Sequence, residues 1–340
     1  MKGVALSIVV PCYNEEACLA ELHRRLSTAA KVAVGGDFEI LLVNDGSRDH
    51  SWDMMKMLAA EDRHVVAINL SRNHGHQLAL TAGLDFCSGE RILIIDADLQ
   101  DPPELIPAMM EEMDRQGADV IYAVRRQRAG ETAFKKATAS IFYRALSRIT
   151  EVEIPVDAGD FRLMSRRALD AFLSLPEQAR FIRGMVAWVG FRQVPFLYDR
   201  AQRHAGVTKY PLRKMLAFAL DAVTGFSTAP LRIASHIGLW LVAASVLLLL
   251  YIAFGFFTGS AIQGWTSLML VVVVLGAAQM FVLGMIGEYL GRLFMEAKHR
   301  PLYIVSDIAG QAGGRRYLGH VAETIATNET PGVSETRPMT

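Results

Sequence analysis

Two aspartates, Asp96 and Asp98, stand one residue apart directly after an apolar run. Carboxylates held this close repel each other unless a cation lies between them, and ligands that are all oxygen select a hard divalent ion such as Mg²⁺ or Mn²⁺. A metal there can hold a diphosphate and neutralise it as it leaves. Gln100 either extends this polar cluster or is solvated, and we expect Asp101 to cap the helix that follows. An Asp-x-Asp pair is common in loops, so its position at a strand end is what favours a metal site.

Polar side chains also follow three other apolar runs. Tyr13 can stack on a planar base and Glu15 can hydrogen-bond the base or a ribose; the alternative is a helix start beside a surface tyrosine. Asp45 can accept from a base N–H or cap the next helix. Arg72 and His76 can face phosphate, or they can be a solvated arginine and a residue at a helix start.

Apolar runs alternate with amphipathic stretches through the first half of the chain. This periodicity predicts strands at 6–10, 38–43, 65–70, 91–95 and 119–124, and helices at 15–31, 52–60, 76–86 and after Pro102-Pro103. Strands separated by helices imply parallel pairing with both sheet faces covered. Ligands bind at the carboxyl ends of such strands. We therefore expect the polar motifs to converge on one crevice.

The second half contains a long uncharged stretch. No Asp, Glu, Lys or Arg occurs from Ile237 to Ile286, so all 70 charged residues lie among the other 290. Within it, 237–257 and 265–286 have 21 and 22 residues, enough for each to cross a hydrocarbon core of about 30 Å. The short link at 258–264 has no Lys or Arg, whereas the outer flanks do, which predicts a helical hairpin with both ends in the cytoplasm. The alternative, a buried hairpin of a soluble protein, is disfavoured by so long an uncharged run.

Composition excludes two classes of protein. Because 35 Lys and Arg balance 35 Asp and Glu, no overall positive field attracts nucleic acid, and an apolar content of 51% is far above that of a disordered chain. Cys12, Cys18 and Cys87 are too few and too irregular for a disulfide framework or a zinc site, which favours a reduced, cytosolic setting. The N-terminal apolar run is predicted to be a strand and not a signal peptide.

Several motifs, in this order and spacing, resemble family 2 glycosyltransferases. Within that family the chain resembles the polyprenyl-phosphate glycosyltransferases, the dolichol-phosphate-mannose-synthase-like branch that includes bactoprenol glucosyltransferases. The resemblance covers about residues 4–305. Its motifs are SIVVPCYNEE at 7–16, VNDGS at 43–47, residues 73–83, DADLQDPPE at 96–104, VDAGDFRLM at 156–164, RGM at 183–185 and RHAGVTKYP at 203–211.

The resemblance implies a glycosyltransferase A-type, Rossmann-like α/β domain followed by interfacial helices and a two-helix transmembrane hairpin. We expect a cytoplasmic catalytic domain at 1–210 and an interfacial amphipathic helix at 211–230, for which a helix packed on the soluble domain is the alternative. The hairpin would occupy 231–292 and a cytoplasmic tail 293–340, disordered after about 307. The implied location is the inner, cytoplasmic membrane.

The resemblance also assigns residues to the donor, a nucleotide sugar. Mg²⁺ or Mn²⁺ would be held by Asp96, Asp98 and Gln100. Arg125 and Arg128 would lie near phosphate, unless they are merely solvated charges. The full set implied for the donor is Pro11, Tyr13, Glu15, Asp45, Arg72, Asp96, Ala97, Arg125 and Arg128.

On the acceptor side, the resemblance implies that Asp157 or Asp160 acts as a base or orients the acceptor, and we favour Asp160. The alternative is a loop carboxylate paired with Arg162 or Arg166. A mobile basic loop would meet the donor or the acceptor phosphate, with simple contact to lipid headgroups as the alternative. Its residues are Arg200, Arg203 and Lys209.

The implied reaction moves one sugar to polyprenyl (undecaprenyl) phosphate with inversion, for cell-envelope glycan or glycolipid modification. UDP-glucose is the donor that the resemblance favours, ahead of other UDP-sugars and GDP-mannose. The resemblance also implies contact with membrane lipids and self-association of the protein. The sequence departs from the family pattern at two positions: Asn44 stands where many relatives have Asp, and His76 stands where some have Lys. Both departures limit what can be inferred about the nucleotide. The Gln-x-x-Arg-Trp segment of processive synthases is absent from the sequence, which favours a single transfer. There are two alternatives. The protein transfers the sugar to another lipid, or it is a non-catalytic, membrane-anchored sensor of nucleotide sugar or lipid.

Overall fold

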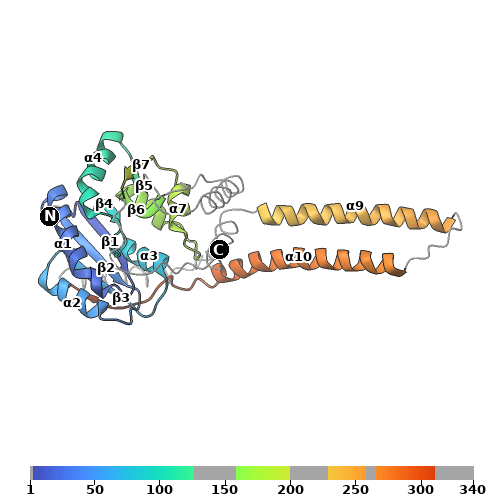
Figure 1. Cartoon of the computed structure of the whole chain (residues 1–340), viewed down its shortest axis with the longest axis horizontal. Coiled ribbons are helices and arrows are strands. Elements are labelled where there is room, and N and C mark those ends of the chain that lie inside the picture. The colour runs from blue at the N-terminus through green and yellow to red at the C-terminus, as the bar shows by residue number, and fades with distance from the viewer. Residues whose placement is uncertain (1–2, 126–157, 200–228, 258–264, 311–340) are drawn as a thin grey trace, which may run out of the picture.

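An eight-stranded mixed sheet forms the centre of the protein, and two long helices project from it (Figure 1). The computed structural model describes residues 3–125, 158–199, 229–257 and 265–310. The strand order is β7-β5-β6-β4-β1-β2-β3-β8. The strands are β1 (Leu6–Cys12), β2 (Phe38–Asn44), β3 (Val65–Leu70), β4 (Arg91–Ile94), β5 (Val120–Arg125), β6 (Ala158–Ser165), β7 (Gln193–Tyr198) and β8 (Val305–Ala309).

Helices cover both faces of this sheet. Side chains alternate along β1, so that Leu6, Ile8 and Val10 belong to one core and Val9 to the other. The first core lies under α1 (Glu16–Val34), α2 (Ser51–Glu61) and α4 (Ile106–Gln116), the last preceded by one 3-10 turn, η1 (Pro103–Leu105). The second lies under α3 (His76–Phe86), α6 (Arg166–Leu173) and α7 (Ile182–Trp188). The five strands and four helices predicted from periodicity are present, with ends displaced by a few residues.

The five predicted strands, β1 to β5, all run in one direction, as predicted, and further strands make the sheet mixed. β1 pairs in parallel with β2 and β4, and β3 continues the parallel set. β6, however, runs antiparallel between β4 and β5, and β8 runs antiparallel to β3. Because β6 runs in reverse, its first residues lie beside the carboxyl end of β4. The reversal therefore brings a second polar segment to the edge of the sheet where ligands bind.

The chain after the projecting helices returns to the sheet. We predicted disorder after about residue 307, but β8 spans Val305–Ala309 and pairs with β3 from Ala67 to Leu70. The strand is short and half exposed, and it lacks a strong apolar pattern. Its backbone pairing with β3 is what defines it. The described chain thus continues three residues past the predicted boundary, to residue 310, and the rest of the tail, 311–340, lies outside the described residues.

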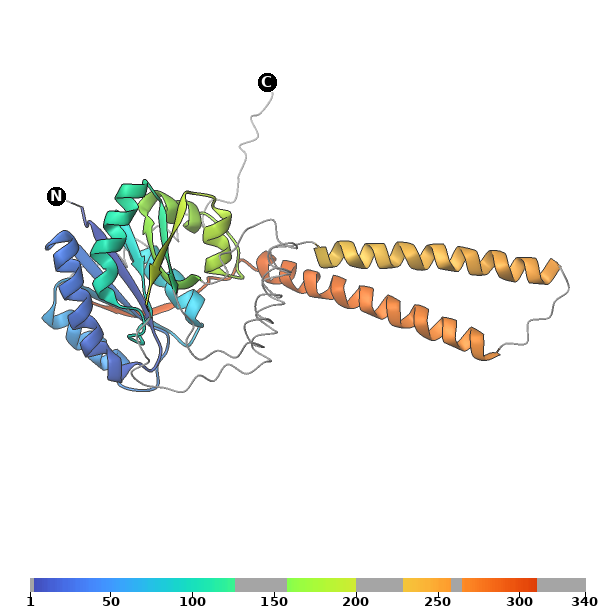
Figure 2. The same cartoon turned by 45° about the horizontal axis from the view of Figure 1, so that its top comes forward.

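The two projecting helices are α9 (Ala229–Phe257), with 29 residues, and α10 (Trp265–Ala297), with 33. They lie side by side in both views (Figures 1 and 2). Many of their large apolar side chains are exposed, among them Leu239, Trp240, Leu247, Leu250, Met280, Phe281, Leu290 and Phe294. Within the described part of the chain, one segment, Val274–Ala297, is long and apolar enough to cross a membrane by length and composition. The predicted interfacial helix at 211–230 lies outside the described residues except for its last two, which begin α9.

Gly46 lies where the loop after β2 touches the loop after β3. Its φ is +63°, and a Cβ there would lie 2.5 Å from the backbone nitrogen of Asn73 and 2.6 Å from the carbonyl carbon of Arg72. Backbone atoms cannot yield as a flexible side chain can. The close approach of these two loops therefore requires glycine at this position.

We predict that Gly46→Ala destabilises the protein by about 1–3 kcal/mol more than Gly117→Ala. Gly117 is the matched control, because its φ is +57° but a Cβ there meets nothing within 4 Å. Both substitutions carry the strain of a positive φ, and only the first adds a backbone clash. Thermal unfolding of the detergent-purified variants, followed by tryptophan fluorescence, measures the difference. Equal midpoints would show that the two loops do not touch.

Candidate active site

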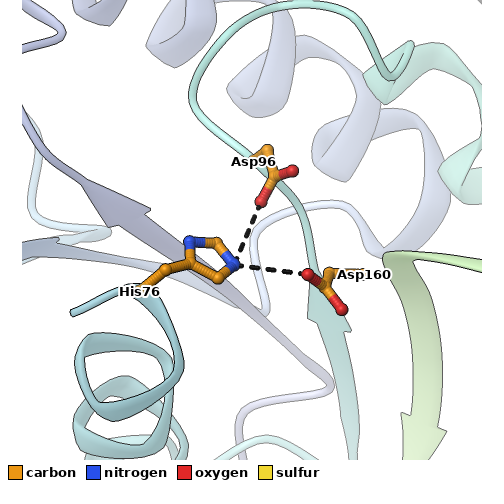
Figure 3. Close-up of side chains that lie close together, drawn as sticks. All are labelled: His76, Asp96 and Asp160. Carbon is orange, nitrogen blue, oxygen red and sulfur yellow. Dashed lines mark ion pairs between the residues drawn. The ribbon is translucent and has the colours of Figure 1, made fainter. Parts of the chain in front are cut away.

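Three side chains from three separate elements meet at the carboxyl edge of the sheet (Figure 3). His76 is the first residue of α3, Asp96 follows β4, and Asp160 lies near the start of β6. The Nε2 atom of His76 lies 3.6 Å from Oδ1 of Asp96 and 3.4 Å from Oδ2 of Asp160. His76 and Asp96, two of the side chains predicted to converge, therefore lie together, and the reversed direction of β6 places Asp160 beside them.

Asp160 is buried, with 7% of its surface exposed, and is surrounded by positive groups. Arg183 of α7 donates from Nε to Oδ1 at 2.8 Å and from Nη2 to Oδ2 at 3.2 Å, and Arg162 lies 3.7 Å away. Burial alone would raise the pKa of Asp160, but His76 and the two guanidinium groups hold it well below its ordinary value. The lowered pKa favours the ionised form of Asp160, and both of its carboxylate oxygens accept from Arg183.

The alternative that Asp160 pairs with Arg162 or Arg166 is confirmed for Arg162. An ion pair with Arg162 is present, but Arg166 is engaged elsewhere, donating from Nε to the carbonyl oxygen of Gly89 at 2.9 Å. The main partner, Arg183, was not predicted, although it lies in one of the motifs that carry the family resemblance. It is 23 residues away in the sequence, and no local pattern links the two. Its helix is fixed to α3 because the backbone N–H of Ile182 donates to Oε1 of Gln77 at 3.0 Å.

Asp96, unlike Asp160, lies among other carboxylates, and its pKa is raised and not lowered. Burial raises the pKa of Asp96 to about 6, and the carboxylates of Asp160, Asp101 and Asp98 add to this against the opposing effect of His76. Its Oδ1 atom is buried and has no hydrogen-bond partner among the described residues. A buried carboxylate oxygen without a donor, beside further carboxylates, is the donor set that a hard divalent cation fits. The residues present therefore suit Mg²⁺ or Mn²⁺.

The rest of the predicted metal set lies in the turn after β4, which ends at Ile94. Asp98 accepts at Oδ1 from the backbone N–H of Gln100 at 3.1 Å, and Gln100 is buried. The prediction that Asp101 caps a helix was wrong, because no side chain caps the turn at Pro103–Leu105. Asp101 instead accepts a hydrogen bond from the hydroxyl of Tyr198, and both residues are buried.

The loop after β1 carries the residues expected to hold a nucleoside. Pro11 belongs to β1, and Tyr13 beyond it is 43% exposed, so its ring is open to stacking. The next residue, Asn14, has φ +57° and is held by the loop after β2: its N–H donates to Oγ of Ser47 at 3.0 Å, and its Oδ1 accepts from the N–H of Arg48 at 2.8 Å. The two loops thus form one rigid unit beside the crevice.

Glu15 belongs to the same unit. Its backbone N–H donates to Oγ of Ser51 at 2.9 Å, which ties it to the start of α2. Burial raises the pKa of Glu15, and the charge of Asp98 adds to the effect. Glu15 is therefore close enough to the candidate metal site for the charge of Asp98 to act on it.

Asp45 fixes the loop from which α3 starts. Its two oxygens accept from the backbone N–H groups of His74 at 2.7 Å and of Gly75 at 3.0 Å. The alternative that Asp45 caps the helix near Trp52 was wrong, because α2 follows His50 without a side-chain cap. Asp45 therefore positions the first turn of α3, and with it His76.

Of the remaining predicted residues, the structure describes the side chains of two, Ala97 and Arg72. Ala97 is buried in the turn, and Arg72 is exposed with Nη1 donating to the carbonyl oxygen of Asn73 at 3.3 Å. Arg125 is the last residue of β5, and its side chain is not described. The predicted residues that lie outside the described part of the chain are Arg128, Asp157, Arg200, Arg203 and Lys209.

Comparison with known proteins decides the family. The family model for Glycosyl transferase family 2 matches residues 7–173. The uncharacterized glycosyltransferase YkcC of Bacillus subtilis (strain 168) is 46% identical over 317 residues, which cover 93% of this chain and 98% of that protein. The chain belongs to glycosyl transferase family 2. The resemblance to this family is thereby confirmed, and so is the mixed α/β sheet domain inferred with it.

This family 2 glycosyltransferase is also similar to a curated relative and to a solved structure. The bactoprenol glucosyl transferase of Shigella phage SfV is 37% identical over 303 residues, covering 89% of this chain and 98% of that protein. A crystal structure of glucosyl-3-phosphoglycerate synthase from Mycobacterium tuberculosis, in complex with Mn²⁺, UDP-glucose and phosphoglyceric acid, superimposes with a TM-score of 0.44 at 21% identity, covering 65% of this chain and 77% of that one.

We predict that Asp45→Ala lowers the free energy of unfolding by about 1–3 kcal/mol, because two backbone N–H groups lose their acceptor. Loosening this loop also frees the start of α3, so UDP should bind more weakly. Asp53→Ala is the matched control, since Asp53 is an exposed carboxylate paired with Lys56. Thermal unfolding and UDP titration of both variants measure the effect, and an Asp45→Ala protein indistinguishable from Asp53→Ala would contradict it.

Proposed function

We propose that this glycosyltransferase moves one sugar from a nucleotide sugar, with UDP-glucose as the leading candidate, to a polyprenyl phosphate at the cytoplasmic membrane, inverting the anomeric carbon. The observation that carries the proposal is the 37% identity to a bactoprenol glucosyl transferase over 89% of the chain. A match of that length extends well beyond the sheet domain, so it includes more than the part that family 2 enzymes share.

The donor side of the crevice supplies the groups that this reaction needs. The exposed ring of Tyr13 stacks on the base, and Glu15 accepts from the nucleoside. Asp96, Asp98 and Gln100 face the diphosphate and would hold Mg²⁺ or Mn²⁺ there. When bound, such an ion neutralises the nucleoside diphosphate as it leaves.

The acceptor side needs no strong base. A phosphate monoester has a second pKa near 6, so most of the acceptor is already a dianion at neutral pH. Its oxygen forms the bond to the anomeric carbon as the bond from that carbon to the nucleoside diphosphate breaks, and the electron pair leaves with the diphosphate. Asp160, ionised and occupied by Arg183, serves to orient Arg183 and His76 and not to remove a proton.

Two membrane-spanning segments within α9 and α10 would keep this chemistry at the lipid surface. The exposed apolar side chains of both helices support insertion, because a surface of this kind is unfavourable in water. The uncharged run from Ile237 to Ile286 supports two crossings, with the sheet domain and the chain after α10 on one side. Holding enzyme and lipid acceptor in one plane then favours their encounter.

The first test follows radiolabel from a panel of UDP- and GDP-sugars into a short-chain polyprenyl phosphate, using the detergent-purified protein. We expect label in the lipid phase from UDP-glucose, loss of transfer with EDTA, and loss in Asp98→Ala. Restoration by Mn²⁺ or Mg²⁺ after EDTA controls for damage to the protein. Binding of nucleotide sugar without labelled lipid from any donor would exclude a polyprenyl phosphate acceptor.

A second test separates orientation from proton removal at Asp160. We predict that Asp160→Asn lowers kcat by roughly 10- to 100-fold, through misplacement of Arg183 and His76, and by the same factor at every pH from about 6.5 to 8.5. A base would give a defect that shrinks as the acceptor ionises above its second pKa. Asp170→Asn, an exposed carboxylate paired with Arg166, should match the wild type.

A further inference from the structure

His76 is placed as a metal ligand is placed. Its Nε2 atom lies 3.6 Å from Asp96 Oδ1 and 3.4 Å from Asp160 Oδ2, and all three atoms lie within 4.8 Å of one another (Figure 3). These separations exceed an ordinary N–H···O hydrogen bond of about 2.9–3.0 Å. Metal–ligand bonds of about 2.0–2.1 Å place two ligands of an octahedral ion about 3 Å apart when adjacent and about 4 Å apart when opposite. The separations of 3.6 and 3.4 Å lie between these two values, so an ion fits between His76 and one of the carboxylates after small shifts of the side chains.

The backbone that carries His76 is rigid. Asp45 holds the N–H groups of both preceding residues, and Gly75 has φ +96°, which sets the angle at which α3 starts. On the other side, Gln77 accepts from the backbone of α7 at 3.0 Å. The imidazole therefore enters the crevice from a fixed helix end, as a preorganised ligand requires.

The two neighbouring carboxylates are not equivalent partners for an ion. Both oxygens of Asp160 accept from Arg183, whose positive charge opposes a cation on that side. Oδ1 of Asp96, the atom that faces His76, is buried and has no hydrogen-bond partner among the described residues. An ion between His76 and Asp96 would give this oxygen the partner that the protein does not supply.

We propose that Nε2 of His76 is a ligand of the divalent ion in this site, together with Asp96, and that it gives the site a preference for Mn²⁺ over Mg²⁺. Imidazole nitrogen is a softer donor than carboxylate and suits transition metals, whereas Mg²⁺ favours oxygen. The inference rests on the metal-dependent transfer proposed above, because it names a ligand of that metal.

Pulsed electron paramagnetic resonance of Mn²⁺ bound to the detergent-purified full chain tests this directly. A coordinated imidazole gives ¹⁴N modulation of the echo, which changes frequency in protein labelled with ¹⁵N-histidine. We expect the modulation in the wild type and its loss in both His76→Ala and His76→Gln. We also expect Mn²⁺ affinity to fall by on the order of tenfold or more in these variants. Mg²⁺ affinity, measured by competition, should fall less.

His74→Ala is the matched control, because His74 belongs to the same loop and its ring lies 3.5 Å from Oγ of Ser71. It should keep both the modulation and the affinity, and the thermal midpoints of all variants show that they are folded. Wild-type Mn²⁺ binding that Asp98→Ala abolishes, but without nitrogen modulation, would overturn the role of His76 and leave the transfer proposal intact. Modulation that survives in folded His76→Ala would overturn it too. Modulation lost with His76, in a protein that labels no polyprenyl phosphate, would support the ligand and count against the proposed acceptor.

Discussion

The arrangement of the crevice depends on how the buried charge of Asp160 is compensated. Its carboxylate gathers Arg183 from α7, Arg162 from its own strand and His76 from α3, so one anion connects three elements. A buried ion pair adds little net stability, but removing one partner leaves a charge that costs several kcal/mol. The network therefore specifies the relative positions of α3, β6 and α7 more than it strengthens the fold.

The same compensation divides the site into two electrostatic halves. Around Asp160 the guanidinium groups outweigh the carboxylate, and its pKa lies well below the ordinary value. Around Asp96 carboxylates predominate, and burial with their repulsion raises its pKa to about 6. His76 stands at the boundary between the halves. A cation is favoured on the Asp96 side and an anion such as a phosphate on the Arg183 side, which is the polarity that a phosphate acceptor and a metal-bound diphosphate donor require.

Much of this could be predicted from the sequence, for identifiable reasons. The strands β1 to β5 carry apolar runs that end in polar turns, and the loops after them hold most of the donor-side residues. The reversal of β6 was not predictable, because Asp160 and Arg162 make the segment polar although it lies buried between two strands. The main partner of Asp160, Arg183, lies 23 residues further along the chain. Asp101 was misjudged for a similar reason: the following prolines favour a cap locally, whereas its actual donor, Tyr198, is 97 residues away.

Polar contacts also tie the end of α10, and the chain that follows it, to the sheet domain. Near the end of α10, Oε1 of Glu296 accepts from the backbone N–H of Gln178 at 2.8 Å, and Tyr303 beyond it donates to Asp85 of α3 at 2.7 Å. The chain then joins the sheet as β8. Gln178 precedes α7 by a few residues, so the loop that meets α10 leads into the helix that carries Arg183. These contacts set the position of α10 and the position of Arg183 together. Under the proposed function, α10 would be the anchor and Arg183 the acceptor-side charge, and transfer to a lipid would need this fixed relation between them.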